Sequence, residues 1–371
     1  MKKTGRVYVS GNNGRKKRKK KLTVRTLSVI LAALVILTVS FIFADMIFDR
    51  PGTSSETSFV LSENTSDFSS EGSSVDTSSQ LSSDLSSSEP ASSAPAADRQ
   101  AGFEQVKADL QSFVNNFDGR IGICYINLAT EESFSINEQL PFVAASSIKM
   151  GIVTQLFKRI ASGELELTSM LKYDSRPYPE GDFEAGSGVV WQEPDGTEFS
   201  VGRTAQLAIT ISDNCATNMI IRKLGGIDAV APLLYDISST VPYREQISYK
   251  NYKGAIESGR HRTSAKDLAM YAADLYHLWK SDEAAYAPLM ENLQNTIFTF
   301  GLQTLLPSEV KVAHKIGTNN AYRAENDVGI IFAGEPYVLC VMTETEIQSE
   351  GRTAVAEVSL MLYEYISSLH E

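Results

Sequence analysis

The sequence predicts an α+β fold, in which an antiparallel sheet formed by the two ends of a C-terminal domain packs with a mostly helical subdomain. Two observations support this prediction. Strand-like segments occur near both ends of the region 99–371, and helical periodicity fills most of the stretch between them. One transmembrane helix and a disordered linker are expected before this domain.

The N-terminal segment combines a basic tail with an apolar run. Residues 1–25 hold eleven Lys and Arg and no acidic residue, and residues 26–44 follow without a charge. Nineteen helical residues span roughly 28 Å, close to the thickness of a bilayer core. Basic flanks stay cytoplasmic, so we expect a cytoplasmic tail at 1–25 and a signal anchor at 26–48. This places the chain in the cell membrane as a single-pass protein with its C-terminal domain extracellular. A cleaved signal peptide is the alternative, although no small-x-small cleavage site follows the run.

The next segment, 49–98, has the composition of a disordered linker. Residues 51–98 contain 18 Ser and few large apolar residues. Such a sequence cannot bury enough apolar surface to fold. A flexible chain of this length reaches roughly 40 Å, so the segment is expected to tether the domain at 99–371.

Apolar periodicity predicts the elements of the domain. Helices are expected at 101–116, 146–160, 201–211, 214–224, 265–279, 283–294 and 351–369. Strands are expected at 120–127, 132–136, 328–332 and 337–343. The broad apolar surface of the helix at 146–160 predicts a central, buried position.

Charge and cysteine content exclude several function classes. Outside the basic tail the chain carries 23 basic and 45 acidic residues, a sign that disfavours nucleic-acid binding. Three cysteines are too few for a disulfide scaffold, and Cys124 and Cys340 are expected to be buried thiols in strands. No Cys or His cluster has zinc-site spacing. We therefore expect no metal, no cofactor and a monomeric catalytic domain.

Ser146 and Lys149 form the first motif whose side chains could carry out catalysis. Residues three apart share one helix face, and Ser146 stands where the helical pattern begins, near exposed N–H groups that favour negative charge. A lysine among apolar neighbours can accept a proton from serine. No G-x-S-x-G elbow is present, so a Ser-His-Asp hydrolase is disfavoured. Alone, S-x-x-K also fits an N-cap serine beside a solvated lysine.

Two further motifs change this interpretation. Ser212-Asp213-Asn214 lies between two predicted helices, and Lys315-Ile316-Gly317-Thr318 lies just before the first of two C-terminal strands. The order S-x-x-K, S-D-N, K-x-G resembles the serine β-lactamase and penicillin-binding-protein superfamily, class A β-lactamases most closely. The resemblance extends from about residue 101 to the end and implies a β-lactamase/transpeptidase-like fold.

The resemblance implies catalytic roles for three side chains. Ser146 would be the acylated nucleophile, Lys149 would help to deprotonate it, and Ser212 would relay a proton to the leaving nitrogen. Asp213 is expected to be structural, because in this family it holds the loop.

Four further positions would bind substrate. Asn214 would hydrogen-bond the substrate's amide side chain, and Lys315 would place positive charge near its carboxylate. The backbone N–H groups of Ser146 and Thr318 would form the oxyanion hole. Gly317 would let substrate lie close to the strand edge.

Two departures from the family pattern disfavour efficient hydrolysis. Ile316 stands where the family has Thr or Ser, and the E-x-x-L-N pattern that supplies the deacylation base is absent from 241–262. The expected position falls near Ser248. Glu245 and Glu257 are the acids of this loop, and Glu245 is the better candidate. Without a positioned base the acyl-enzyme would persist.

One aromatic pair leaves two interpretations open. Tyr178 and Trp191 lie in the Gly- and Pro-rich stretch 176–198, where they could form a wall of the cleft or pack within the loop.

Together these features predict a membrane-anchored, extracytoplasmic serine hydrolase of class A β-lactamase type. Its substrate would be a β-lactam or a D-alanyl, peptidoglycan-peptide-like small molecule. The alternative is a penicillin-binding, wall-binding or regulatory domain with little or no turnover.

Overall fold

The computed structural model describes residues 96–241, 247–259 and 262–370. The predictions for 1–25, 26–48 and the linker up to residue 95 therefore lie outside the described residues. Within the described part, none of the helices has the length and hydropathy needed to cross a membrane.

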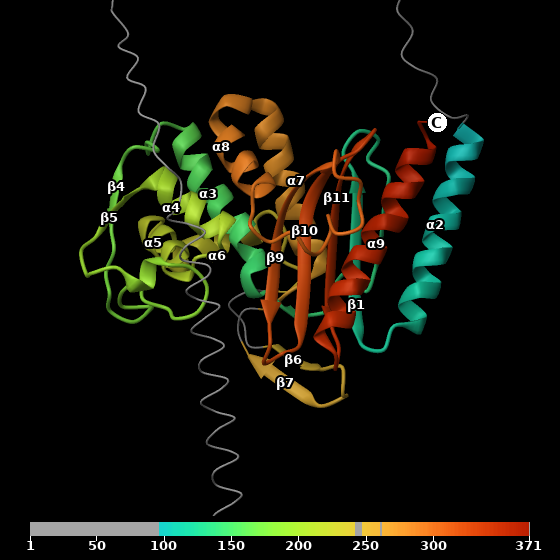
Figure 1. The fold of residues 1–371 in the computed structure, drawn as a ribbon, viewed down its shortest axis with the longest axis horizontal. Coiled ribbons are helices and arrows are strands. Elements are labelled where there is room, and N and C mark those ends of the chain that lie inside the picture. Colours follow the sequence, from blue (N-terminus) through green and yellow to red (C-terminus); the bar gives the residue numbers. More distant parts are fainter. Residues whose placement is uncertain (1–95, 242–246, 260–261, 371) are drawn as a thin grey trace, which may run out of the picture. The chain divides into compact units, whose positions relative to one another are not determined.

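A five-stranded antiparallel sheet with strand order β2-β1-β11-β10-β9 forms the centre of the domain (Figure 1). Its strands are β1 (Arg120–Asn127), β2 (Ser133–Ile136), β9 (Lys311–Asn319), β10 (Ala324–Phe332) and β11 (Pro336–Glu344). The first strand pairs with the last in antiparallel register, so that Cys124 lies opposite Cys340. Both are buried free thiols, as expected. The prediction that the two ends of the domain meet in one sheet is therefore confirmed.

The sequence predicted two strands in the C-terminal half and missed β9. Period-two alternation is absent from this strand because residues 312–317 are all buried. They include the polar side chains of His314 and Lys315. The Nδ1 atom of His314 lies 2.7 Å from Asp327 Oδ2 on the neighbouring strand. This tertiary contact offsets the cost of burying the polar side chains. In the sequence alone, such polar residues indicate a loop.

Helices cover both faces of the sheet. They are α2 (Ala96–Asn116), α3 (Lys149–Ala161), α4 (Val201–Thr210), α5 (Asn214–Lys223), α6 (Ile227–Tyr235), α7 (Ala265–Ser281), α8 (Glu283–Gln294) and α9 (Gln348–Ser368). All were predicted except α6, which follows Gly225-Gly226 and contains Pro232, features typical of a loop. Helices α2 and α9 lie side by side on one face (Figure 1).

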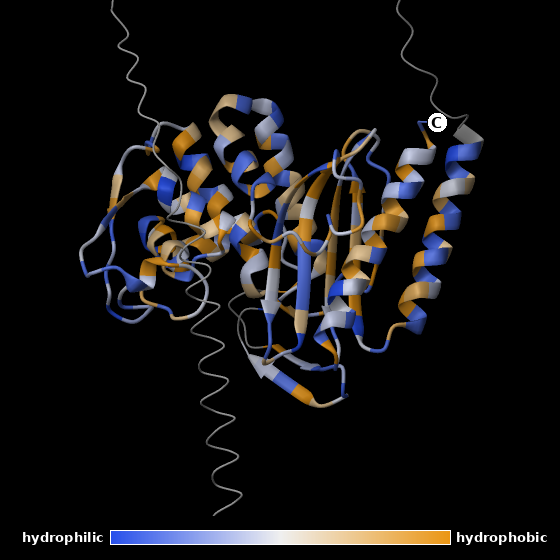
Figure 2. Ribbon diagram, viewed as in Figure 1, coloured by the Kyte–Doolittle hydropathy of each residue, from blue (hydrophilic) through white to orange (hydrophobic). Residues whose placement is uncertain are grey.

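The two faces of the sheet bury two separate apolar cores. Alternate residues of a strand point to opposite faces: Ile123 packs with α2 and α9, whereas Cys124 packs toward α3 and α7. Apolar residues recur along the elements that meet in these cores (Figure 2). The helix α3 lies in the larger core with nine buried residues, which agrees with the central position predicted for it.

Short strands and turns connect the helical subdomain to the sheet. They are β3 (Phe142–Val143) paired with β8 (Arg262–Thr263), β4 (Met170–Lys172) with β5 (Glu198–Ser200), and β6 (Ile247–Lys250) with β7 (Ile256–Gly259). Two 3₁₀ turns complete the set, η1 (Ala145–Ile148) and η2 (Val190–Gln192).

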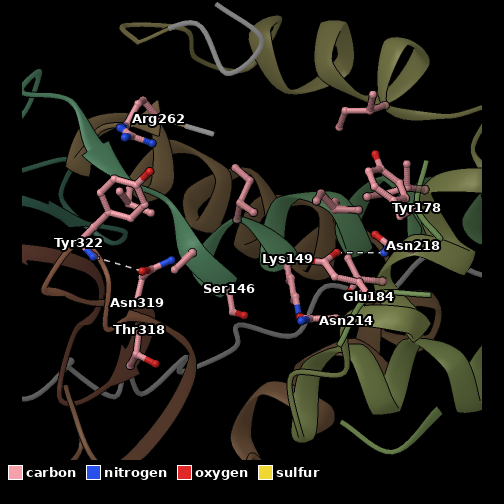
Figure 3. Close-up of a pocket in the computed structure, with 17 residues that line it drawn as sticks. Ser146, Lys149, Tyr178, Glu184, Asn214, Asn218, Arg262, Thr318, Asn319 and Tyr322 are labelled. Atoms are coloured by element: carbon pink, nitrogen blue, oxygen red, sulfur yellow. Dashed lines mark hydrogen bonds between the residues drawn. The ribbon is translucent and has the colours of Figure 1, made fainter. Parts of the chain in front are cut away.

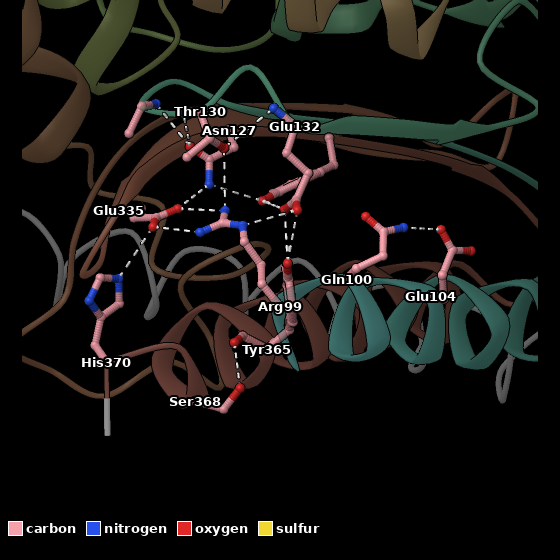
Figure 4. Close-up of polar contacts among 12 residues, drawn as sticks. Arg99, Gln100, Glu104, Asn127, Thr130, Glu132, Glu335, Tyr365, Ser368 and His370 are labelled. Carbon is pink, nitrogen blue, oxygen red and sulfur yellow. Dashed lines mark hydrogen bonds and ion pairs between the residues drawn. The ribbon is translucent and has the colours of Figure 1, made fainter. Parts of the chain in front are cut away.

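A polar cluster fixes the first turn of α2 to the rest of the domain (Figure 4). The guanidinium of Arg99 makes a two-pronged ion pair with Glu335 in the β10–β11 turn, with both N···O distances 2.8 Å. Arg99 Nε also donates to Glu132, which accepts a hydrogen bond from Tyr365 Oη on α9. The Arg99 guanidinium and Asn127 hold the pKa of Glu335 below its usual value. A bidentate ion pair fixes the orientation of the two groups as well as attracting them. The cluster therefore fixes the orientation of the first turn of α2 relative to the sheet.

Candidate active site

Ser146 stands on η1, which runs without interruption into α3. The carbonyl of Ala144 accepts hydrogen bonds from the backbone N–H and the hydroxyl of Ser147, at 3.3 and 2.6 Å. Asn326 on β10 donates to the carbonyl of Val143 at 2.8 Å. The backbone on both sides of Ser146 is therefore held in place, and its N–H lies at the positive end of a helix.

Lys149 projects from the same turn into the interior, and 5 % of its surface is exposed. Its Nζ donates to the carbonyl of Ser212 at 2.6 Å, to Ser212 Oγ at 3.3 Å and to Asn214 Oδ1 at 2.8 Å. In the described contacts Ser146 Oγ is not one of its acceptors. Burial disfavours the ammonium and lowers the pKa of Lys149 to about 8. A proton acceptor active near neutral pH thus lies one turn from the serine.

The segment 212–214 turns sharply between α4 and α5. Ser212 has a positive φ of 57° and a buried side chain. The carboxylate of Asp213 caps α5 through Ala216 N at 2.9 Å and accepts from the N–H groups of Val189 and Val190 at 2.6 and 2.9 Å. These contacts agree with the structural role expected for Asp213, which joins the loop at 174–197 to the helix.

Lys315 is buried on β9 and does not line the cavity to which Ser146 belongs. Its Nζ donates to the carbonyl of Ile316 at 3.0 Å and lies 5.7 Å from the ring centre of Phe298. Burial and the nearby charge of Lys149 lower the pKa of Lys315 well below its usual value. Two buried amines therefore compete for a proton in this part of the domain.

Gly317 has a packing reason that sequence reasoning did not find. A Cβ at this position would lie 2.7 Å from Ala144 O and 2.7 Å from Ser147 N. Only a glycine lets β9 approach the turn that carries Ser146 so closely. Its neighbour Thr318 faces the cavity.

A cavity of about 370 Å³ brings several motif residues together (Figure 3). This volume is in the range of small-molecule sites. Among the predicted residues Ser146, Lys149, Asn214 and Thr318 line it, whereas Ser212, Lys315 and Gly317 are not among its lining residues. Its other lining residues are Val143, Ala145, Ile148, Ile152, Tyr178, Glu184, Thr217, Asn218, Ile221, Ile227, Arg262, Asn319 and Tyr322.

The loop between β4 and β5 supplies residues that sequence reasoning missed or left open. Tyr178 lines the cavity, whereas Trp191 lies outside it with 41 % of its surface exposed. Glu184 also lines the cavity and is the sole carboxylate among its described lining residues. The sequence signal for Glu184 is weak, because the stretch 176–198 holds several acidic residues.

The described residues of the loop expected to hold the deacylation base place no carboxylate in the cavity. Glu245 lies outside the described residues. Ser248 is on strand β6, which forms a hairpin with β7. The carboxylate of Glu257 accepts hydrogen bonds from Tyr249 Oη and Asn251 Nδ2 at 3.2 and 2.7 Å. Neither Ser248 nor Glu257 lines the described cavity.

Comparison of the sequence with known proteins points to one family. A family model described as the beta-lactamase enzyme family matches residues 105–366. The chain is 24 % identical over 257 residues to beta-lactamase SME-1 of Serratia marcescens, an alignment that covers 67 % of this chain and 85 % of that protein.

Solved structures share the fold at similar levels of identity. PBP-A superposes with a TM-score of 0.60 at 23 % identity, over 71 % of this chain and 96 % of that one. A mutant of PBP-A, solved as an acyl-enzyme complex with penicillin G, gives 0.59 at 23 %, over 76 % and 100 %. A beta-lactamase from Sphaerobacter thermophilus gives 0.59 at 22 %, over 72 % and 98 %.

Proposed function

The chain belongs to the beta-lactamase enzyme family, as a class A-like serine hydrolase, and we propose on that basis that it transfers acyl groups through Ser146. The substrate would be a β-lactam or a D-alanyl peptide of the kind found in peptidoglycan. The observation that carries this proposal is the cavity in which Ser146, Lys149 and Thr318 meet.

Acylation is proposed to begin at Lys149, one helical turn from Ser146. A pKa of about 8 leaves a useful fraction of neutral amine near pH 7, and the free amine can take the proton of Ser146 Oγ. The serine oxygen attacks the substrate carbonyl, and the N–H groups of Ser146 and Thr318 stabilise the oxyanion. When the C–N bond breaks, Ser212, hydrogen-bonded to Lys149 at 3.3 Å, passes a proton to the leaving nitrogen.

Charge supports an anionic substrate. Arg262 lines the cavity near Tyr322, and its guanidinium lies 4.8 Å from the centre of that ring. It adds positive potential at the end of the cavity where Thr318 lies, which suits the carboxylate of a penicillin or of a C-terminal D-alanine. The acyl-enzyme of the PBP-A mutant with penicillin G supports the same substrate class.

Release of the acyl group is proposed to be the slower step. Ile316 stands where the family has Thr or Ser, and the loop at 241–262 lacks the E-x-x-L-N pattern that supplies the deacylation base in the family. These two features favour a second candidate function, a penicillin-binding domain with little turnover.

The location is proposed from the N-terminal sequence. The basic tail before Thr26 and the Ser-rich segment after Ala44 support a membrane-anchored domain outside the cell.

Two probes test the proposed function on one preparation. The purified chain would be mixed with a fluorescent penicillin to follow covalent labelling and with a reporter cephalosporin to follow turnover. We expect rapid labelling and slow release. Absence of both labelling and turnover would contradict acyl transfer at this site.

A further inference from the structure

Glu184 reaches the active-site cavity from the loop between β4 and β5, far in sequence from the loop 241–262. Its Oε2 accepts a hydrogen bond from Asn218 Nδ2 at 3.0 Å. Asn218 is on α5 with 4 % of its surface exposed, and it also donates to the carbonyl of Asp182 at 3.2 Å. The carboxylate is therefore held against a buried amide of the helix that follows Ser212-Asp213-Asn214.

The backbone around Glu184 is fixed by further contacts. Glu184 N donates to Cys215 Sγ at 3.3 Å, and the Cys215 thiol donates to the carbonyl of Glu184 at 3.5 Å. Two residues earlier, the fully buried Asp182 forms an ion pair with Arg222 at 2.7 Å. It also accepts a hydrogen bond from Asp174 N at 2.9 Å. A loop anchored in this way presents its carboxylate at a defined place, as a catalytic group requires.

The position of the carboxylate suits attack on an acylated Ser146. Figure 3 shows Glu184 beside Lys149, Asn214 and Asn218, with Thr318 on the other side of Ser146. In the proposed acyl-enzyme the carbonyl oxygen would point to the N–H groups of Ser146 and Thr318, and Glu184 lies on the opposite side of Ser146 from Thr318. A water molecule could approach the ester carbon from that side.

On the basis of the proposed function, we propose that Glu184 is the general base that activates water for hydrolysis of the Ser146 acyl-enzyme. The carboxylate takes one proton from water while the water oxygen bonds to the ester carbon. The tetrahedral intermediate then collapses, the bond between the carbon and Ser146 Oγ breaks, and Oγ takes the proton back. The products are the free serine and a carboxylic acid, and Glu184 is a carboxylate again.

The test measures acylation and acyl-enzyme lifetime separately on the full chain, with a fluorescent penicillin as the probe. Glu184→Gln keeps the size of the side chain and an oxygen for the Asn218 hydrogen bond but cannot accept a proton. We expect its acyl-enzyme to live at least 10²-fold longer than that of the unmodified chain, the effect of a lost general base, with acylation unchanged within threefold. Glu184→Asp, whose shorter carboxylate is still a base, should give an intermediate lifetime.

Two matched variants serve as controls. Glu180→Gln removes an exposed carboxylate of the same loop that does not line the cavity, and Glu245→Gln removes the acid favoured by the sequence. Neither should lengthen the lifetime of the acyl-enzyme.

Equal lifetimes for Glu184→Gln and the unmodified chain would overturn the proposal, as would a longer lifetime for Glu245→Gln alone. A slower acylation without a longer lifetime would also overturn it, since Glu184 would then act through Lys149. No labelling of the unmodified chain would overturn the proposed function, and this role with it.

Discussion

Gly317→Ala is expected to separate β9 from the turn that carries Ser146. The new Cβ would lie 2.7 Å from Ala144 O and Ser147 N and 3.0 Å from Ser147 Cβ, where ordinary contacts begin at 3.4 Å. Two of the three opposing atoms belong to the backbone, which cannot rotate away. The strand would therefore have to retreat by about 0.7 Å.

This movement would affect both stability and acylation. Overpacking of this kind costs about 1–3 kcal/mol, which lowers the Tm of a domain this large by roughly 2–10 °C. The proposed oxyanion N–H groups of Ser146 and Thr318 lie on the two segments that separate. A misplacement near 1 Å costs about 10²-fold in rate, so we expect acylation to slow by about 10- to 100-fold.

The assay is the rate of labelling by a fluorescent penicillin, with thermal unfolding measured on the same samples. Gly102→Ala is the matched control, because its Cβ would meet only the Tyr365 ring, at 3.3 Å, on the opposite face of the sheet. Its acylation rate should equal that of the unmodified chain. Labelling of Gly317→Ala within threefold of the unmodified rate would refute the reasoning.

Three other predictions concern charge, capping and topology. Burial lowers the pKa of Lys149 from 10.5 to about 8, so the unfolded chain holds this proton more tightly and stability should rise as pH increases from about 8 to 10.5. The shift corresponds to about 3 kcal/mol. Lys149→Met lacks this group, so its melting temperature should not show the rise between about pH 8 and 10.5, and it should not be labelled by penicillin. Acylation of the unmodified chain should speed up as pH rises through about 8, and a flat profile would argue against Lys149 as the proton acceptor. Asp213→Ala removes the cap of α5 and the acceptor of two backbone N–H groups, which should cost about 2–4 kcal/mol, against about 1 kcal/mol for Ser200→Ala, the cap of α4. Protease added to intact cells should remove the domain at 99–371, and protection until lysis would contradict the predicted orientation.

Local patterns were sufficient to predict the elements with a clear apolar period. The strand β1 contains three isoleucines and is apolar over most of its length, and α3 repeats an apolar residue every four positions. Neither depends on distant partners for its pattern. The strand β9 does depend on them, because His314 and Lys315 are polar residues whose burial is made possible by Asp327 and by the surrounding fold.

The residues of the candidate site also fall into two groups, those predictable from local motifs and those that depend on distant partners. The motif residues Ser146, Lys149 and Asn214 were predicted from spacing and family resemblance, and the structure brings them to one cavity. Glu184 could not be placed from spacing, because its partner Asn218 is 34 residues away and is reached only when the loop folds onto α5. The same applies to Asn326, whose side chain holds the backbone before Ser146 from 183 residues away.

The site of covalent attachment tests the central claim most directly. The full chain would be incubated with penicillin G, and the modified peptide identified by mass spectrometry after digestion. We expect one adduct per chain on Ser146, and no adduct on Ser146→Ala, whose melting temperature should stay within a few degrees of the unmodified chain. An adduct on another residue, or equal labelling of both proteins, would contradict the account.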